Sequence, residues 1–357
     1  MKTRLYLDHA ATTPMLPEAR DAVSEAMGAW ANPSSPHSEG RAARAALEDA
    51  RARIKAALGW DHELIFTSGA SEAIALGLAC AKAGRIVVSA VEHDAVLRSA
   101  GDVPMLPVDS DGRVDGGKLN WTLAGGDEPA IVAIQSVNNE TGVKQNLAEL
   151  GERIAVGGNL LFADCSQSAG KLPLPGADLI AVSAHKLGGP PGIGALLVRD
   201  LASLHALGGQ EKGYRPGTEN LPAALGLAAA LEAPKGWLDR AAELRHHCDK
   251  AIEKEGGSVV ARDADRIATI AGYRMPGMAA TAQLIQFDMA GIAISAGSAC
   301  ASGSLKSSHV LAAMGWNEAE ASEVIRVSFG PQTKRADIYR FIESWTRFAG
   351  EARERAA

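Results

Sequence analysis

Short apolar runs alternate with helix-like segments through the first two hundred residues, and this alternation is the feature that most restricts the fold. The run at 129–137 is long and continuously apolar, which is typical of a strand buried on both faces of a sheet. Such alternation favours a mostly parallel sheet flanked by helices, so we predict an α/β fold. The predicted strands cover residues 64–67, 85–89, 103–108, 129–137, 159–164, 178–183 and 193–199, and the helices between them include 71–83 and 147–156.

The second half of the chain predicts a smaller α/β unit. The chain has 357 residues, of which 46% are hydrophobic, enough for a large core and for two domains. Helical segments at 221–232 and 237–255 lead to strands at 267–271, 292–295 and 324–329. We expect a large domain over residues 12–250 and a small domain over 1–11 and 251–357, with the N-terminal residues folded back onto the small domain.

Composition excludes several classes of partner. The formal net charge is -6 and the basic residues are dispersed, whereas nucleic acid and anionic membranes favour a basic face. No apolar run approaches the ~20 residues of a membrane span, and no signal-peptide core follows Met1. Cys80, Cys165, Cys248 and Cys300 lie far apart, with no CxxC. We therefore expect a cytoplasmic protein without a metal site or a disulfide framework.

A lysine at the end of a predicted strand is the first candidate for chemistry. Lys186 closes the sequence SAHK, which follows the apolar run 178–182. A lysine placed there loses hydration, so its amine pKa falls and it can condense with an aldehyde such as pyridoxal 5′-phosphate (PLP). Asp164 ends another strand, three residues before Gln167, and an aspartate can hold the pyridine nitrogen of PLP protonated. The alternative is an ordinary solvated lysine.

The segment FTSGAS at 66–71 indicates an anion site. A buried strand, a tight turn and a helix follow one another there, so backbone N–H groups and hydroxyls meet at a helix N-terminus, an arrangement that binds phosphate. An ordinary capped helix is the alternative. Dinucleotide and Walker motifs are absent, since there is no GxGxxG and residues 189–194 are not followed by Lys-Ser or Lys-Thr.

Three further residues have both a functional and a plain interpretation. His93 follows the strand 85–89, where its ring could stack on a cofactor or simply be solvated in a loop. Cys300 lies in a loop of small residues, AGSACASGS at 296–304, which we expect to be mobile and accessible; a passive thiol is the alternative. Arg326 lies within an apolar strand and requires a partner, either a substrate carboxylate or a buried Asp or Glu.

These motifs together resemble the cysteine desulfurases of the NifS/IscS type, which belong to the class V aminotransferases of PLP fold type I. The resemblance covers nearly the whole chain. Its marks are YLDHAATTP at 6–14, FTSGASE at 66–72, EH at 92–93, VNNETG at 137–142, Asp164 with Gln167, SAHK at 183–186, RPGTEN at 215–220 and SAC at 298–300. The sequence departs from the family at Ile74 and Ala75, where relatives usually carry polar residues, often Asn at the second position.

The resemblance implies a PLP enzyme that converts L-cysteine to L-alanine and leaves a persulfide on Cys300. Lys186 would carry PLP and move the substrate Cα proton, His93 would stack on the ring, and Arg326 with Asn139 would bind the substrate. The cofactor-binding residues implied are Ala70, Ser71, His93, Asn139, Asp164, Gln167, Ser183, His185, Lys186 and, from the neighbouring subunit of a homodimer, Thr218.

The resemblance also implies a partner, a sulfur-acceptor or Fe–S scaffold protein, for Fe–S cluster or other thio-cofactor biosynthesis. Two alternatives stay open at this point. One is a class V aminotransferase or a selenocysteine lyase on the same scaffold, for which Cys300 would be dispensable. The other is a non-catalytic sulfur-assembly scaffold, which the departures at Ile74 and Ala75 make conceivable.

Overall fold

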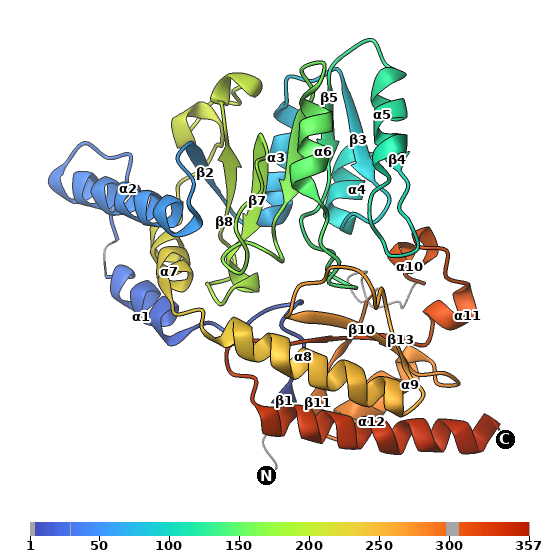
Figure 1. Cartoon of the computed structure of the whole chain (residues 1–357). Coiled ribbons are helices and arrows are strands. Elements are labelled where there is room, and N and C mark those ends of the chain that lie inside the picture. The colour runs from blue at the N-terminus through green and yellow to red at the C-terminus, as the bar shows by residue number, and fades with distance from the viewer. Residues whose placement is uncertain (1–3, 29, 298–306, 357) are drawn as a thin grey trace.

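A seven-stranded sheet forms the centre of the larger part of the molecule. The computed structural model describes residues 4–28, 30–297 and 307–356 (Figure 1). The strand order is β2-β8-β7-β6-β5-β3-β4, in which β7, β6, β5, β3 and β4 are parallel and β8 is antiparallel to both of its neighbours. The strands are β2 Glu63–Thr67, β3 Arg85–Ser89, β4 Met105–Leu106, β5 Ala130–Ala133, β6 Leu160–Asp164, β7 Leu179–Ser183 and β8 Gly194–Val198. The predicted α/β fold with a mostly parallel sheet is confirmed.

Helices cover both faces of this sheet. The helices are α1 Pro17–Ala26, α2 Ser38–Leu58, α3 Ala70–Cys80, α4 Asp94–Ala100, α5 Gly116–Ala124, α6 Leu147–Ala155 and α7 Leu221–Glu232. Residues of α2, α5, α6 and α7 share one buried cluster, and residues of α3 and α4 share another. Alternate residues of β7 join the two clusters, with Ile180 and Val182 in the first and Leu179 and Ala181 in the second. This period of two is the geometry of a strand buried on both faces.

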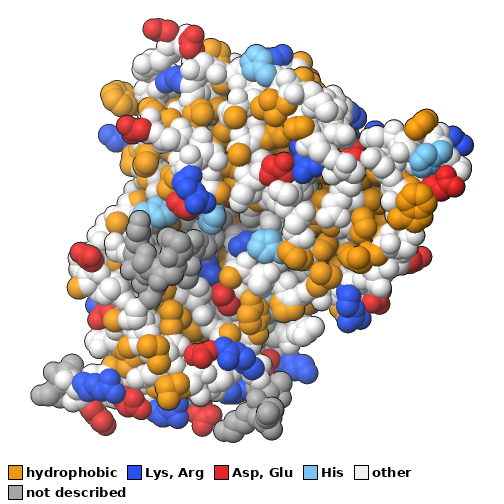
Figure 2. Space-filling view, turned by 180° about the vertical axis from the view of Figure 1, so that it is seen from behind, with side chains coloured by type: hydrophobic (Ala, Val, Ile, Leu, Met, Phe, Trp, Pro, Cys, Tyr) orange, Lys and Arg blue, Asp and Glu red, His pale blue; other side chains and the backbone are white. Residues whose placement is uncertain are grey.

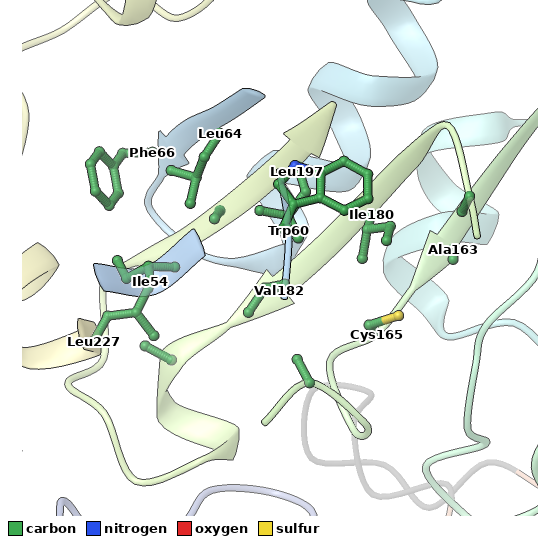
Figure 3. Packing of buried hydrophobic residues seen from close by; sticks show 14 of the residues in the cluster. Ile54, Trp60, Leu64, Phe66, Ala163, Cys165, Ile180, Val182, Leu197 and Leu227 are labelled. Atoms are coloured by element: carbon green, nitrogen blue, oxygen red, sulfur yellow. The ribbon is translucent and has the colours of Figure 1, made fainter. Parts of the chain in front are cut away.

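The first cluster shows how the sheet face is filled. Ile54 of α2 and Leu227 of α7 lie near Val182 and Leu197 of the sheet, with Trp60 close by (Figure 3). Helix α2 presents Leu47, Ala50 and Ile54 as its buried side and ends at Gly59, whose φ of 65° is the left-handed conformation that glycine adopts readily. Because its apolar residues recur at helical spacing, α2 packs one face against α7.

The second part of the chain contains two small sheets. A four-stranded antiparallel sheet has the order β12-β13-β10-β9, and a two-stranded parallel sheet pairs β1 with β11. These strands are β1 Leu5–Tyr6, β9 Ser258–Val259, β10 Ile270–Arg274, β11 Ile292–Ala293, β12 Ser295–Ala296 and β13 Val324–Ser328. The helices are α8 Trp237–Lys254, α9 Ala280–Met289, α10 His309–Ala313, α11 Glu318–Ala321 and α12 Arg335–Ala356. Strand β10 begins three residues later than the predicted 267–271.

Helix α8 packs with the second part of the chain. Ala241, Leu244 and Cys248 of α8 belong to a buried cluster that includes Tyr273 of β10 and Trp345 of α12. Figure 1 shows α8 and α12 running side by side in the lower part of the view, and the two helices are in contact. Since the first strand also pairs within this part, we propose that the small domain consists of the N-terminal strand and a segment that begins near residue 237, before the expected boundary at 250.

No helix among the described residues is both long and apolar enough to cross a membrane.

A buried ion pair fixes the loop that follows β8. The guanidinium of Arg51 donates to both carboxylate oxygens of Glu211, at 2.8 and 2.9 Å, and the backbone N–H of Phe66 donates to the same carboxylate at 2.7 Å. Glu211 and Lys212 have φ values of 49° and 57°, a left-handed conformation that is costly for residues with side chains. The buried pair therefore holds the loop in a conformation that its residues do not favour by themselves.

We predict that Arg51→Leu lowers the free energy of unfolding by about 3–5 kcal/mol, because it leaves the Glu211 carboxylate buried and unpaired. The matched control is Arg53→Leu on the same helix. Its bidentate partner Glu232 is 43% exposed, so the loss should stay within about 1 kcal/mol. Urea unfolding of the two variants measures both values, and equal losses would contradict the role assigned to the buried pair.

Candidate active site

A pocket of about 480 Å³ lies where β3, β5, β6 and β7 end, the edge at which open α/β sheets bind ligands. The face drawn in Figure 2 shows a hollow near the middle of the molecule, where histidine and basic side chains gather. Nine of the residues predicted to bind the cofactor line this pocket together. They are Ala70, Ser71, His93, Asn139, Asp164, Gln167, Ser183, His185 and Lys186.

Lys186 is held in a tight turn directly after β7. Residues Ala184–Lys186 form a 3-10 turn, which the N–H groups of Leu187 and Gly189 close by donating to the carbonyl oxygen of Ala184. The Nζ atom of Lys186 donates to the carbonyl oxygen of Ala10 at 2.5 Å. The amine is therefore positioned between the end of a central strand and a turn from the N-terminus of the chain.

Asp164 has a fixed orientation at the end of β6. Its carboxylate is buried, and Oδ1 accepts hydrogen bonds from the backbone N–H of Ser166 at 2.8 Å and from its Oγ at 2.5 Å. Gln167 donates from Nε2 to the carbonyl of Ala10 at 2.9 Å, while its buried Oε1 has no hydrogen-bond partner within the part of the chain that is described. Ser166 also lines the pocket and was not among the predicted residues.

His93 has a defined tautomer because it caps helix α4. Its Nδ1 accepts a hydrogen bond from the backbone N–H of Ala95 at 3.1 Å, so the ring proton of the neutral form is on Nε2. Burial lowers the pKa of His93, with nearby Asp164 opposing the shift and Lys186 adding to it. The ring is therefore neutral at pH 7, suited to stacking or to accepting a proton.

Glu92 is a buried acid beside this histidine that sequence reasoning did not assign a role. The side chain is fully buried, and Oε1 accepts from the backbone N–H of Gln135 at 2.8 Å. Burial raises the pKa of Glu92 to about 8, and the neighbouring Asp164 adds to the shift. Glu92 thus remains protonated at neutral pH, and Asp164 does not face a second negative charge.

The turn before α3 forms an anion cradle. Gly69 precedes α3 without a side-chain cap, so backbone N–H groups of the first turn remain available beside the Ser71 hydroxyl. The turn approaches β8 closely: a Cβ at Gly194 would lie 2.5 Å from the carbonyl oxygen of Val182 and 2.7 Å from Cα of Gly69. Only glycine fits at position 194, and this close approach brings Ser71 and Ser183 to the same pocket.

His185 completes this side of the pocket. Burial lowers the pKa of His185 to about 4, and the positive charge of Lys186 contributes. The Nδ1 atom of His185 lies 3.2 Å from the Thr12 hydroxyl. A neutral imidazole at this position is suited to donating or accepting one hydrogen bond, without adding a charge.

The N-terminal turn 8–13 is part of the site. Besides the contacts of Ala10, the N–H of Thr13 donates to the carbonyl of His185 at 2.8 Å, and its hydroxyl donates to the carbonyl of Lys186 at 3.2 Å. His9 is buried and its pKa falls to about 4, mainly because of burial. The Thr12 hydroxyl approaches His185 of the pocket, whereas His9 does not line it.

Arg326 does not line the cofactor pocket. It is 2% exposed on β13, and it donates to Asp8 Oδ1 at 2.9 Å and to the carbonyl of Asn139 at 3.0 Å. A different cavity, of about 200 Å³, is lined by Arg326, Glu140 and Ser308. Of the two partners considered for this arginine, the carboxylate of another residue is the one observed.

Two other predicted residues are not in the pocket of this chain. Thr218 is exposed and does not line it. Cys300 lies outside the described residues. Ile74, one of the two departures from the family, is buried and lines the pocket, whereas Ala75 is exposed.

The arrangement of a strand-end lysine, a buried aspartate, a neutral imidazole and an anion cradle on an α/β sheet defines a PLP-dependent enzyme. The family described as "Aminotransferase class-V" matches residues 5–341. The chain belongs to this family, in its cysteine desulfurase group of the NifS/IscS type.

Individual relatives are similar to this chain over nearly their whole length. The "IscS-like cysteine desulfurase" of Mycobacterium tuberculosis is 37% identical, covering 95% of this chain and 94% of the relative. The "Cysteine desulfurase IscS" of Dictyoglomus turgidum is 35% identical, covering 95% of this chain and 92% of the relative. Among solved structures, a NifS-like protein from Rickettsia africae superposes with a TM-score of 0.89 at 31% identity, covering 97% of this chain and 99% of that chain.

The pKa of Glu92 predicts a pH dependence of stability. Because the folded pKa of about 8 lies above the ordinary 4.5, this group contributes stability fully below pH ~4.5, and the contribution is lost as the pH rises through 8. Glu92→Gln should remove this decline. The free energy of unfolding of the variant, relative to wild type, should rise between pH 4.5 and 8 by at most about 1.4 kcal/mol per pH unit.

Urea unfolding across this pH range provides the measurement. Glu152→Gln, at an exposed position of α6, is the matched control and should run parallel to wild type. A Glu92→Gln profile that also runs parallel to wild type would show that Glu92 is ionised in the folded protein.

Proposed function

We propose that this chain is a cysteine desulfurase that converts L-cysteine to L-alanine and transfers the sulfur to Cys300. The observation that carries the proposal is the single pocket in which Lys186, Asp164 and His93 meet. The relatives named above are cysteine desulfurases, and a similar solved structure is described as "SspA in complex with cysteine", with a TM-score of 0.80 at 29% identity.

The residues of the pocket fit PLP by their chemistry. Bound PLP supplies an electron sink for the bonds at the substrate Cα. Asp164 would pair with the protonated pyridine nitrogen, and His93 would stack on the ring. Ser71, Ser183 and His185 surround the end of the pocket where backbone N–H groups are available for a phosphate, with Ala70 at the helix start. Asn139 and Gln167 offer amide groups for the phenolic oxygen.

Lys186 would carry the cofactor and later act as a base. Its Nζ atom lies 2.5 Å from the Ala10 carbonyl oxygen, which gives the released amine an acceptor beside the pocket. An amine held there is suited to removing a proton from the substrate Cα and returning it. Arg326 would bind the substrate carboxylate, because its guanidinium is the buried cation next to the carbonyl of Asn139.

Cys300 would accept the sulfur. Its thiolate forms a bond to the sulfur of the substrate while the carbon–sulfur bond breaks; the electron pair of that bond goes to carbon, which takes up a proton and leaves as alanine. Neutral His93 is suited to accepting the thiol proton. Cys80, Cys165 and Cys248 are buried, and burial raises the pKa of Cys165 and Cys248 to about 12, so neither is a nucleophile at neutral pH.

We further propose a cytoplasmic homodimer that donates its sulfur to an acceptor or Fe–S scaffold protein. The exposed Thr218 would reach the phosphate of the partner subunit, and this fits its absence from the pocket of its own chain. The names of the relatives support the desulfurase over the aminotransferase, the selenocysteine lyase and the non-catalytic scaffold.

Cys300→Ser should retain the fold, the bound PLP and the absorbance change on adding cysteine, but lose sulfide and alanine production. The reason is that a hydroxyl is a much weaker nucleophile toward sulfur than a thiolate. Mass spectrometry of the wild-type protein after exposure to cysteine should find one added sulfur on the peptide that contains Cys300. Alanine substitutions at Cys80, Cys165 and Cys248 are the controls, and full turnover by Cys300→Ser would disprove the mechanism.

A shared site predicts complementation between two inactive chains. Lys186→Ala removes the amine, and Thr218→Asp places a negative charge where the partner's phosphate is expected. A heterodimer of the two contains one site with both residues intact, so it should recover up to half of the wild-type activity. The control pairs Lys186→Ala with a chain that carries both substitutions. Purified heterodimers without recovery, or a fully active Thr218→Asp homodimer, would contradict the shared site.

A further inference from the structure

The guanidinium of Arg326 donates hydrogen bonds to two groups of the protein, and some of its N–H donors remain available. Nη2 donates to Asp8 and Nη1 to the carbonyl oxygen of Asn139, whereas the buried Nε has no hydrogen-bond partner among the described residues. Five N–H donors lie in the plane of a guanidinium, so two contacts leave three for another molecule. The orientation of this plane is set before any substrate arrives.

Asp8 is itself rigidly placed. The backbone at Asp8 forms a parallel bridge with Ser328 of β13, and the N–H of Ser328 donates to the carbonyl of Leu7 at 2.8 Å. The hydroxyl of Tyr6 donates to the carbonyl of Asp8 at 3.0 Å. Asp8 and Arg326 therefore belong to adjacent, hydrogen-bonded segments. The Asp8 side chain is only 19% exposed, so it differs from the mobile side chains of surface ion pairs.

A second carboxyl group, that of Glu140, also lies near Arg326, so the orientation of the guanidinium depends on Asp8. Glu140 is buried, accepts a hydrogen bond from the Ser308 hydroxyl at 2.6 Å, and lies close enough to Arg326 to interact with its charge. Burial raises the pKa of Glu140. Glu140 and Arg326 line the same cavity, so without Asp8 the guanidinium would be free to turn toward Glu140, and its remaining N–H donors would change direction.

We propose that Asp8 is a positioning residue for substrate selection: it fixes the Arg326 guanidinium so that its spare N–H donors face the α-carboxylate of the amino-acid substrate. This inference rests on the proposed role of Arg326 in binding that carboxylate. A bidentate arginine–carboxylate pair depends on the angle of the guanidinium plane, so a lost anchor weakens binding even though Asp8 does not touch the substrate.

The test compares Asp8→Ala, Asp8→Asn and Arg326→Gln in the PLP-loaded enzyme. For Asp8→Ala, we expect the KM for cysteine to rise about 10- to 100-fold, the effect of losing one charge-assisted hydrogen bond, with kcat within about twofold. Asp8→Asn keeps an acceptor oxygen and should recover most of the loss. Binding of cysteamine, which lacks the carboxylate, is followed by cofactor absorbance and should stay within about twofold of wild type in Asp8→Ala.

A double variant separates positioning from an independent role. Because Asp8 acts through Arg326, Asp8→Ala combined with Arg326→Gln should bind cysteine no more weakly than Arg326→Gln alone. The matched control is Asp288→Ala, which removes an exposed ion pair with Arg4 in the same N-terminal segment and should leave the KM unchanged. Thermal unfolding and cofactor absorbance verify that each variant is folded and loaded.

The outcomes distinguish this inference from the proposed function. If Arg326→Gln leaves the KM for cysteine unchanged, the carboxylate role of Arg326 is wrong. If Arg326→Gln raises the KM while Asp8→Ala does not, the function stands and the positioning role of Asp8 is wrong. Additive effects in the double variant, an equal loss of cysteamine binding, or tighter cysteine binding by Asp8→Ala would also overturn the inference.

Discussion

The carbonyl oxygen of Ala10 is the acceptor around which the site is assembled. It receives hydrogen bonds from Lys186 and Gln167, which follow two different strands of the large sheet. The same N-terminal turn continues from β1, which pairs with β11 in the second part of the chain. A single turn therefore connects the proposed cofactor lysine to the small sheets, so the two parts of the molecule must be assembled before the site has its geometry.

Burial then decides which groups of the site carry charge. The low-dielectric surroundings lower the pKa of His93 and His185 and raise that of Glu92, so these three groups are neutral near pH 7. Lys171, half-buried near Lys186, has a pKa lowered to about 7, mainly by desolvation and partly by the charge of Lys186. The loss of these charges leaves fewer ionised groups beside Lys186 and Asp164 at the cofactor pocket.

The sequence predicted the features of the fold and site that depend on neighbouring residues in the chain. Continuous apolar runs identified the strands of the large sheet, and the residues that end those strands, such as Lys186 and Asp164, necessarily meet at one edge. The sequence did not reveal the acceptor at Ala10, because a backbone carbonyl has no residue identity and its partners are 157 and 176 positions away. The packing of α8 against residues of β10 and α12 could not be predicted either, since an amphipathic pattern shows a buried face but not the surface that covers it.

The turn after β5 links the cofactor pocket to Arg326. Asn138 holds this turn by accepting hydrogen bonds from the N–H groups of Glu140 and Thr141, and it donates to the carbonyl of Val91, next to the buried Glu92. Asn139 consequently lines the cofactor pocket while its carbonyl oxygen holds Arg326. Because one turn supplies both contacts, a displacement at position 139 would move the lining of the pocket and the acceptor of Arg326 together. The two proposed binding functions are thus mechanically coupled through residues 138–140.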